Sequence, residues 1–341
     1  MKLGHGLGLL YPPFARRAST PAPTLTAVSP DWGLVGGGIR VDFTGTNFTG
    51  ASGATVNGQS LTGFTVDSPT AAHGTVPAAT GSTAVALTSA TITTPGGTAT
   101  LTNAWTYLPA SPSLILLSNV GVTGTTTITK WADQSGSSND FNQNGGLAAP
   151  ALITNVLNGL PAVRFTSSGH QSLELGDGVA ANYPLSRIVT ASAYTYYLML
   201  IWRSPIGTNS SNSYANEAVW SDETNGVFGY HAKSSGPTAI AYQFHGADLH
   251  ADQTIATSTA YVASVKYDGA NLKHWKNGGS VATTASGNVD SVARNLRMGI
   301  DFTQSIYADL DLLAALAFKT AHSDADRGVI ESWLGHRGGI F

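Results

Sequence analysis

The chain has 341 residues, which is enough for two or three domains, and 42% of them are hydrophobic, which is ample for packed cores. Charged residues make up 11% and the net charge is −3, so the composition gives no general attraction to nucleic acid, and none is expected as a partner. The chain contains no cysteine, which excludes disulfides, thiolate metal sites and cysteine nucleophiles.

Residues 1–22 are predicted to form an extended basic arm. Its charged side chains are Lys2, Arg16 and Arg17, and no acidic residue occurs before Asp31. One interpretation is a floppy terminus, the commoner fate of chain ends. We favour an arm that anchors the protein on a partner, with apolar contacts from Leu9, Leu10, Tyr11 and Phe14.

The same segment has some features of a secretion signal, because Lys2 precedes the apolar residues 7–11. Pro12 and Pro13 interrupt the apolar part, and Arg16 and Arg17 stand where small residues would form a cleavage site. We therefore expect no export signal. No apolar run approaches the roughly 20 residues that span a bilayer, so membrane insertion is not expected either.

Residues 23–108 are predicted to form short strands separated by turns. Ile39, Val41 and Phe43 alternate with polar residues, and alternation returns over 99–107, as in half-buried antiparallel strands. The segment resembles an IPT/TIG immunoglobulin-like domain, which implies a small β-sandwich. The resemblance is carried by Val28-Ser29-Pro30, Gly36-Gly37-Gly38, Thr44-Gly45-Thr46-Asn47-Phe48, Thr75-Val76-Pro77 and Thr94-Pro95-Gly96-Gly97-Thr98.

Residues 109–112 are the expected linker, which prolines at both ends make semi-rigid. In the second domain, 113–341, the stretch 194–202 is apolar at both odd and even positions, as in a central strand buried on two faces. Residues 261–267 and 272–278 flank an Asp268-Gly269 turn, which predicts a hairpin.

A short helix is predicted near the end of the chain. Ser323 and Asp326 have the spacing of a capping box, and residues 335–337 fit a C-terminal end. One helical face carries the apolar residues Val329, Ile330, Trp333 and Leu334.

The second domain resembles the concanavalin A-like (laminin-G-like) domains of bacteria and phages. The resemblance is carried by Trp131, Asp133, Ser135, Gly136, Asn139 and Asp140 in one turn, by Pro150 and Leu152, by the run from Asn158 to Phe165, and by the Ser323-Asp324-Ala325-Asp326-Arg327 cap. Asp326 replaces the usual Glu of the cap, and Arg337-Gly338 stands in place of Lys-Trp. The resemblance implies an all-β chain: an arm, an Ig-like sandwich, and a larger jelly-roll sandwich with a C-terminal helix.

Because concanavalin-like folds include glycoside hydrolases, a pair of acidic side chains has to be considered. Asp309 and Asp311 are spaced to share one face of a strand. The expected hydrolase pattern also has glutamates, but none occurs here, and Leu313 takes the third position. We therefore expect a solvated strand and no enzyme activity; a polysaccharide depolymerase is the alternative that this pair would support.

Asp133, Asn139 and Asp140 could ligate Ca²⁺ through their side-chain oxygens, as rim sites of some laminin-G domains do. The alternative is an Asx turn, in which these side chains cap their own backbone. We favour the turn, because calcium prefers six or more oxygen ligands, and we expect no other cofactor.

A saccharide site is the more plausible functional feature. A sugar binder combines an aromatic platform with planar polar groups, and the stretch 220–231 contains both. The candidates are Trp220, Asp222, Asn225, Tyr230 and His231; the alternative is that the aromatic residues belong to the core.

Taken together, these features predict a non-enzymatic bacteriophage virion protein, displayed on the particle surface as a capsid decoration or head fibre. Its expected partners are other virion proteins and host or environmental glycans, with homo-oligomers on the particle. The alternatives are a tail-associated receptor-binding adhesin, or a secreted adhesin at the bacterial cell surface. These assignments rest on analogy between folds.

Overall fold

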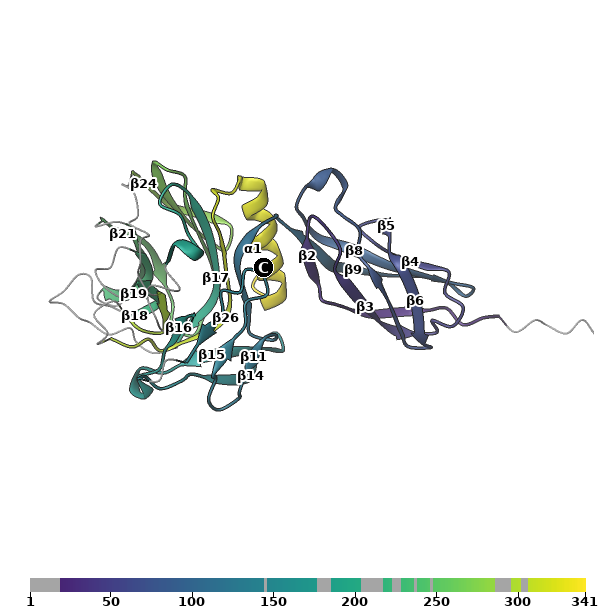
Figure 1. The fold of residues 1–341 in the computed structure, drawn as a ribbon, viewed down its shortest axis with the longest axis horizontal. Coiled ribbons are helices and arrows are strands. Elements are labelled where there is room, and N and C mark those ends of the chain that lie inside the picture. The colour runs from purple at the N-terminus through teal and green to yellow at the C-terminus, as the bar shows by residue number, and fades with distance from the viewer. Residues whose placement is uncertain are drawn as a thin grey trace, which may run out of the picture. The chain divides into compact units, whose positions relative to one another are not determined.

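The computed structural model describes residues 19–143, 146–176, 185–203, 217–222, 228–235, 238–245, 248–285, 296–301 and 306–341. Its strands form four sheets, and α1 (Asp324–Gly338) is the α-helix of these residues (Figure 1). The all-β fold class with one C-terminal helix is thereby confirmed. The arm candidates Lys2, Leu9, Leu10, Tyr11, Phe14, Arg16 and Arg17 lie outside the described residues.

The chain divides into two compact units. The first contains the residues up to Asp31 together with 37–77 and 88–105, and the second contains 32–36, 78–87 and 106–341. Short segments that precede the expected linker thus group with the second unit.

Residues 24–108 form two sheets in which polar and apolar positions alternate. In β3, Val41 and Phe43 are fully buried, whereas Arg40 and Asp42 are exposed and form an ion pair of 2.7 Å. One sheet has the strand order β1 (Thr24–Ser29), β3 (Arg40–Thr46), β7 (Ala71–Thr75), β6 (Thr62–Ser68). The other has the order β2 (Trp32–Leu34), β9 (Gly97–Leu108), β8 (Val85–Thr94), β4 (Gly53–Val56), β5 (Gln59–Ser60), and a 3-10 turn, η1 (Thr80–Ser82), precedes β8.

The second unit contains an eight-stranded and a nine-stranded antiparallel sheet, which we call the larger sandwich. The first sheet has the order β14 (Ala151–Leu157), β15 (Leu160–Phe165), β26 (Leu310–Phe318), β17 (Tyr194–Trp202), β22 (Ala260–Tyr267), β23 (Asn271–Lys276), β24 (Gly279–Ala285), with β10 (Pro112–Leu117) also paired to β26.

The nine-stranded sheet has the order β11 (Val122–Thr123), β12 (Lys130–Trp131), β13 (Phe141–Asn142), β16 (Leu173–Leu175), β25 (Leu296–Met298), β18 (Glu217–Asp222), β19 (Phe228–Ser235), β20 (Thr238–His245), β21 (Asp248–Ile255). Two 3-10 turns, η2 (Ser167–Gly169) and η3 (Leu185–Arg187), lie in the connections.

An apolar core fills the space between these two sheets. The ring of Tyr196 on β17 lies 5.0 Å from that of Trp220 on β18, centroid to centroid. The strand predicted over 194–202 is confirmed: Tyr196 and Leu198 belong to this core, whereas Tyr197 and Met199 face a second apolar cluster on the other side of the sheet. Burial on both faces explains why both parities are apolar.

Helix α1 covers that outer face of the eight-stranded sheet. Ile330, Trp333 and Leu334 pack in the same cluster as Tyr197 and Met199. Ser323 is the N-cap, as the predicted capping box requires: its Oγ accepts a hydrogen bond from the amide of Asp326 at 3.1 Å. The carboxylate of Asp326 accepts a hydrogen bond from the Ser323 hydroxyl at 2.8 Å.

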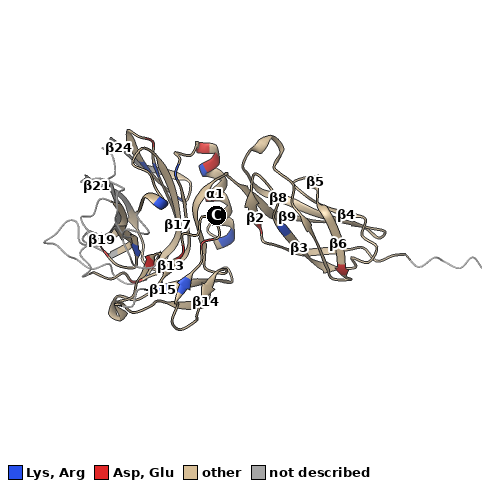
Figure 2. Cartoon of the chain, in the orientation of Figure 1, with Lys and Arg blue, Asp and Glu red and all other residues tan. Residues whose placement is uncertain are grey.

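The helix continues to Gly338, slightly beyond the predicted end. Gly339 follows with φ 60°, a left-handed conformation that glycine adopts without strain. Acidic side chains in the first turn and Arg337 in the last complement the helix dipole (Figure 2).

His322, which precedes the helix, is 5% exposed. Its Nδ1 lies 2.8 Å from the hydroxyl of Tyr197, and its ring lies 4.3 Å from that of Phe318. The backbone carbonyl of His322 accepts a hydrogen bond from Lys266 at 2.9 Å. The start of α1 is therefore tied to β17 and β22 through this histidine.

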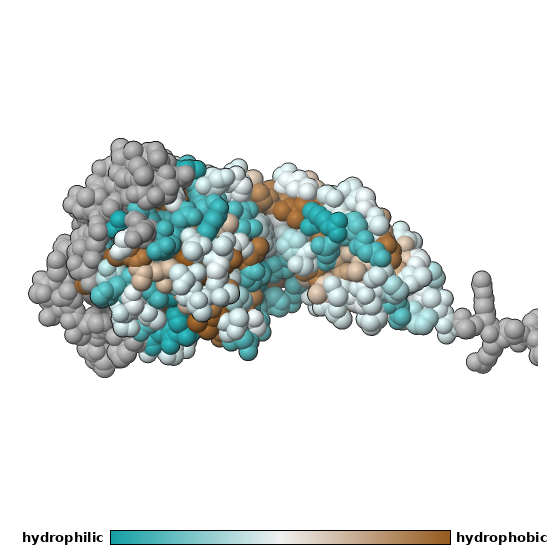
Figure 3. Space-filling model, turned by 60° about the horizontal axis from the view of Figure 1, so that its bottom comes forward, coloured by the Kyte–Doolittle hydropathy of each residue, from teal (hydrophilic) through white to brown (hydrophobic). Residues whose placement is uncertain are grey.

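Few large apolar side chains are exposed on the described surface. Val120 and Phe341 are its exposed large apolar side chains. On the face shown in Figure 3, apolar residues reach the surface in small separate areas. None of the helices in the described ranges has the length and apolar character of a membrane span.

Candidate functional site

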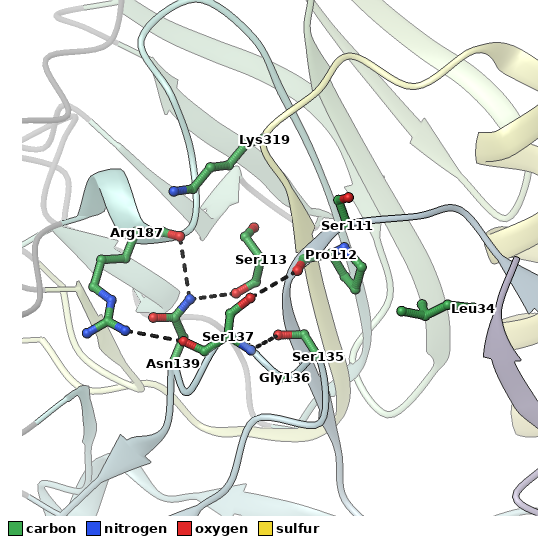
Figure 4. Close-up of a pocket in the computed structure, with 10 residues that line it drawn as sticks. All are labelled: Leu34, Ser111, Pro112, Ser113, Ser135, Gly136, Ser137, Asn139, Arg187 and Lys319. Carbon is green, nitrogen blue, oxygen red and sulfur yellow. Dashed lines mark hydrogen bonds between the residues drawn. The ribbon is translucent and has the colours of Figure 1, made fainter. Parts of the chain in front are cut away.

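A pocket of about 600 Å³ opens in the second unit, a volume within the range of roughly 300–1,000 Å³ that small-molecule sites occupy. Its walls come from the start of β10, the loop between β12 and β13, η3, and the residue that follows β26 (Figure 4). The lining residues are Leu34, Ser111, Pro112, Ser113, Ser135, Gly136, Ser137, Asn139, Arg187 and Lys319.

The loop between β12 and β13 is shaped by the carboxylate of Asp133. One of its oxygens accepts hydrogen bonds from the amides of Ile115 and Ser135, both at 2.9 Å. The other accepts from the hydroxyl of Ser135 at 2.7 Å and from the amide of Asn139 at 3.0 Å. Asp133 therefore fixes both ends of the loop that forms one wall of the pocket.

Asp140 has a similar role in the same loop. One oxygen accepts the amide hydrogen of Asp133 at 2.8 Å, and the other lies 2.5 Å from Nζ of Lys130. The oxygens of both aspartates are thus engaged by N–H and O–H donors, as the Asx-turn interpretation predicts. Among the described residues, no group of three acidic or histidine side chains is arranged to hold a metal ion.

Asn139 is the third residue of that weak calcium candidate, and it lies in the pocket wall. Its side-chain nitrogen donates to the carbonyl of Ser113 at 2.6 Å and to that of Arg187 at 3.4 Å, which fixes the orientation of the amide. Its oxygen, Oδ1, has no partner, although the residue is only 1% exposed. A buried acceptor without a donor costs about 1–3 kcal/mol.

Two basic side chains line the pocket. Arg187 and Lys319 line it, and no acidic side chain is among the described residues that do so. Arg187 is oriented by a hydrogen bond of 3.2 Å from its guanidinium to the carbonyl of Ser137 (Figure 4).

The predicted aromatic platform is not found at the surface. Trp220, Tyr230 and His231 are all fully buried, and Trp220 and Tyr230 belong to the core between the sheets of the larger sandwich. Tyr230 has polar neighbours inside, with its hydroxyl 3.3 Å from Nε2 of His274. A buried ring offers no face to a sugar, so none of these three residues forms an exposed platform.

The other two candidates are Asp222 and Asn225. Asp222 is the last residue of β18, and its side chain lies outside the described atoms. Asn225 lies outside the described residues. A role for them in saccharide binding stays a prediction.

The acidic pair considered for catalysis is divided between two environments. Asp311 is 3% exposed, and its two oxygens accept hydrogen bonds of 2.6 and 2.8 Å from the guanidinium of Arg164 on β15. Asp309 precedes β26 and is more exposed. The Asp311 carboxylate is therefore a structural partner of Arg164.

Sequence reasoning overlooked Arg187, Lys319 and the serines at 111, 113 and 137 as pocket residues. They come from segments far apart in the chain, and no local spacing connects them. The one available signal was Asn139, whose place in a turn was recognised but whose unpaired oxygen is visible only in three dimensions.

Comparison with known proteins gives distant likenesses only. No family matches the sequence, and neither does any curated protein. Among solved structures, a Trypanosoma rangeli sialidase in complex with a difluorinated keto-deoxy-nononic acid is 8% identical over 69% of this chain and 34% of that one, with a TM-score of 0.45.

Two further solved structures match to a similar extent. Domain 4 of an extracellular arabinanase from Geobacillus stearothermophilus, in complex with arabinotriose, is 10% identical over 66% of this chain and 98% of its own, with a TM-score of 0.44. The receptor-binding domain of a botulinum neurotoxin of mosaic serotype C/D is 12% identical over 65% and 50%, with a TM-score of 0.43. The chain thus spans about a third of the sialidase and half of the neurotoxin domain, and likenesses at this level assign neither a family nor a ligand.

Proposed function

We propose that the larger sandwich is a non-catalytic saccharide-binding domain and that the pocket around Asn139 is its binding site. The observation that carries the proposal is the buried, unpaired Oδ1 of Asn139 in a wall that also presents serine hydroxyls. A sugar offers several hydroxyl donors at fixed positions, which suits an acceptor that is held rigidly from behind.

The composition of the wall supports the same reading. Ser111 and Ser137 are exposed lining residues with hydroxyl groups, and Pro112 provides an apolar surface beside them. Hydroxyl groups can donate or accept, so they fit the mixed polarity of a sugar edge. A weak single site of this kind binds more tightly overall when several copies of the domain bind the same surface at once.

The test is a glycan array followed by calorimetric titration of the full chain. We expect the wild type to bind at least one glycan, and Ser137→Leu, which narrows the pocket, to weaken that binding tenfold or more. The matched control is Ser168→Leu, the same change at an exposed residue of η2 that does not line the pocket. If the wild type binds no glycan on the array, or if Ser137→Leu leaves binding unchanged, the proposal is contradicted.

The more specific role that we propose is display on a bacteriophage particle, as a capsid decoration or head fibre. Its support is the order of segments in the sequence: a basic arm, a segment that resembles an Ig-like module, and the larger sandwich. Deletion of residues 1–20 is expected to leave a folded protein that no longer binds particles. Unchanged particle occupancy would refute the arm's role, and neighbouring genes for export machinery would favour the secreted adhesin instead.

A further inference from the structure

Three described hairpin turns consist of the same pair of residues, Asn-Gly. Asn57-Gly58 joins β4 to β5, Asn158-Gly159 joins β14 to β15, and Asn277-Gly278 joins β23 to β24. In each turn both residues have a positive φ, between 47° and 80°, as a two-residue turn of type I′ requires. Two further Asn-Gly pairs, at 144–145 and 225–226, lie outside the described residues. The three described sites share one dipeptide and one type of turn, and they differ in what holds them.

An Asn-Gly pair can react with itself, because glycine has no side chain to shield its backbone nitrogen. That nitrogen attacks Cγ of the asparagine, the bond from Cγ to the side-chain nitrogen breaks, and ammonia leaves with the proton of the glycine amide. A five-membered imide ring remains. Water opens the ring by adding OH to one of its carbonyl carbons and H to its nitrogen, which gives aspartate or isoaspartate. The net reaction takes up one water and releases one ammonia.

The closed turn opposes this reaction. A left-handed residue has its Cβ beside its own carbonyl oxygen, and therefore on the far side from the next nitrogen. Ring closure requires the turn to open, so that the bond from Cα to the carbonyl carbon can rotate. The rate at each site is then set by the fraction of time that the turn spends open.

Two of the three side chains are held by hydrogen bonds. Nδ2 of Asn158 donates to the carbonyl of Arg337 at 2.9 Å, and Oδ1 of Asn277 accepts from the amide of Val262 at 2.9 Å. The side chain of Asn57 makes no hydrogen bond to any residue that the structure describes.

The backbone of Asn57 is held, but not at the bond that must rotate. Its amide donates to the carbonyl of Ser89 at 3.0 Å. This amide precedes the bond from Cα to the carbonyl carbon, so the hydrogen bond can persist while Gly58 turns. At the other two sites the hydrogen bonds hold the side-chain amide that contains Cγ itself, and they must break before ring closure.

The strand that follows Asn57 is also the shortest of the three. β5 consists of Gln59 and Ser60 and pairs with β4 at the edge of its sheet. β15 has six residues and pairs on both sides, with β14 and β26, and β24 has seven residues. Fewer backbone hydrogen bonds therefore oppose the opening of the Asn57 turn.

We propose that Asn57 is a site of spontaneous modification, at which the nitrogen of Gly58 displaces the side-chain amide and water converts the imide to aspartate or isoaspartate. Each event adds one negative charge to the turn between β4 and β5. Isoaspartate also lengthens the backbone by one carbon between Val56 and Gln59, the pair that this two-residue turn closes. The site belongs to the first unit and does not depend on the proposed saccharide function.

The test follows the wild-type full chain at pH 7.5 in water labelled with heavy oxygen, beside a second sample kept unfolded in urea. Peptide mass spectrometry reads each Asn-Gly site separately, and each new product carries one labelled oxygen from the water. Incubation continues until half of each site in the urea sample is converted. In the folded sample we expect Asn57 to convert at least about fivefold faster than Asn158 and Asn277, the factor that one ordinary hydrogen bond is worth.

The urea sample has no closed turns, so its three peptides should convert at similar rates. Asn57→Gln is the matched control: it keeps an amide, but its ring closure needs a six-membered ring, so its peptide should stay unconverted while Asn158 and Asn277 behave as in the wild type. The proposal is overturned if Asn57 converts no faster than the other two in the folded protein. It is also overturned if the lead of Asn57 persists in urea, or if the fold protects all three sites fully.

Discussion

Acidification is expected to destabilise the larger sandwich through His322. Burial lowers the pKa of this histidine from 6.5 to about 4; the nearby Asp326 raises the pKa and Lys266 lowers it, but burial dominates. The unfolded chain therefore binds a proton on His322 at a higher pH than the folded protein does. The contribution of neutral His322 to the free energy of unfolding is fully present above pH 6.5. It is lost as the pH falls from 6.5 towards 4.

The magnitude follows from the two pKa values. Each unit of difference corresponds to about 1.4 kcal/mol, and the full difference therefore to about 3 kcal/mol. At pH 5 about 2 kcal/mol of that is already lost, because the unfolded histidine is almost fully protonated and the folded one hardly at all. No reduction for solvent screening is needed, since the side chain is buried against Phe318 and Tyr197.

The assay is urea unfolding of the full chain at pH 7.5, 6 and 5, followed by tryptophan fluorescence. The control is His322→Gln, which cannot gain a proton in this range; because it also changes the contacts with Tyr197 and Phe318, only the change in stability between the pH values is compared. Wild type should lose about 2 kcal/mol more than the variant between pH 7.5 and 5. Equal losses in the two proteins would refute the reasoning, because the pH dependence would then come from other groups.

Three further changes test the described contacts, each by the midpoint of urea or thermal unfolding. Asp311→Asn should cost about 2–3 kcal/mol, because it leaves the partly buried Arg164 without its carboxylate; a variant as stable as the wild type would show that the pair contributes nothing. Trp220→Ala should cost about 3–5 kcal/mol through a core cavity, and a folded, fully stable variant would contradict its burial. Ser323→Ala should cost about 1 kcal/mol and Ser323→Asp much less, because only the latter keeps an acceptor for the helix N-terminus; equal effects would argue against the cap.

Local patterns predicted the parts of the fold that local physics determines. The strand over 194–202 could be recognised because burial on two faces leaves it apolar at both odd and even positions apart from Thr195, and the cap at Ser323 because its partner is three residues away. The Asx turn at Asp133 belongs to the same class, since most of its donors lie within six residues.

The site depends on contacts between residues that are far apart in the sequence. An aromatic residue on a strand can face the core or solvent with equal ease, and only the pairing of β18 with β25 and β19 turns Trp220 inward. The pocket brings Ser113, Asn139, Arg187 and Lys319 together from four separate segments. The order of strands in the sheets brings these residues together, and their spacing along the sequence does not reveal it.

The position of β26 has a consequence for how the larger sandwich is made. This strand comes almost last in the chain, yet it pairs with β10, β15 and β17, all of which are synthesised well before it. Until residues 310–318 leave the ribosome, these three strands lack the strand that joins them in one sheet. Their edges towards β26 then have no hydrogen-bond partner. Such distant pairings slow folding and lengthen exposure to aggregation, so the eight-stranded sheet cannot be completed before residues 310–318 are available.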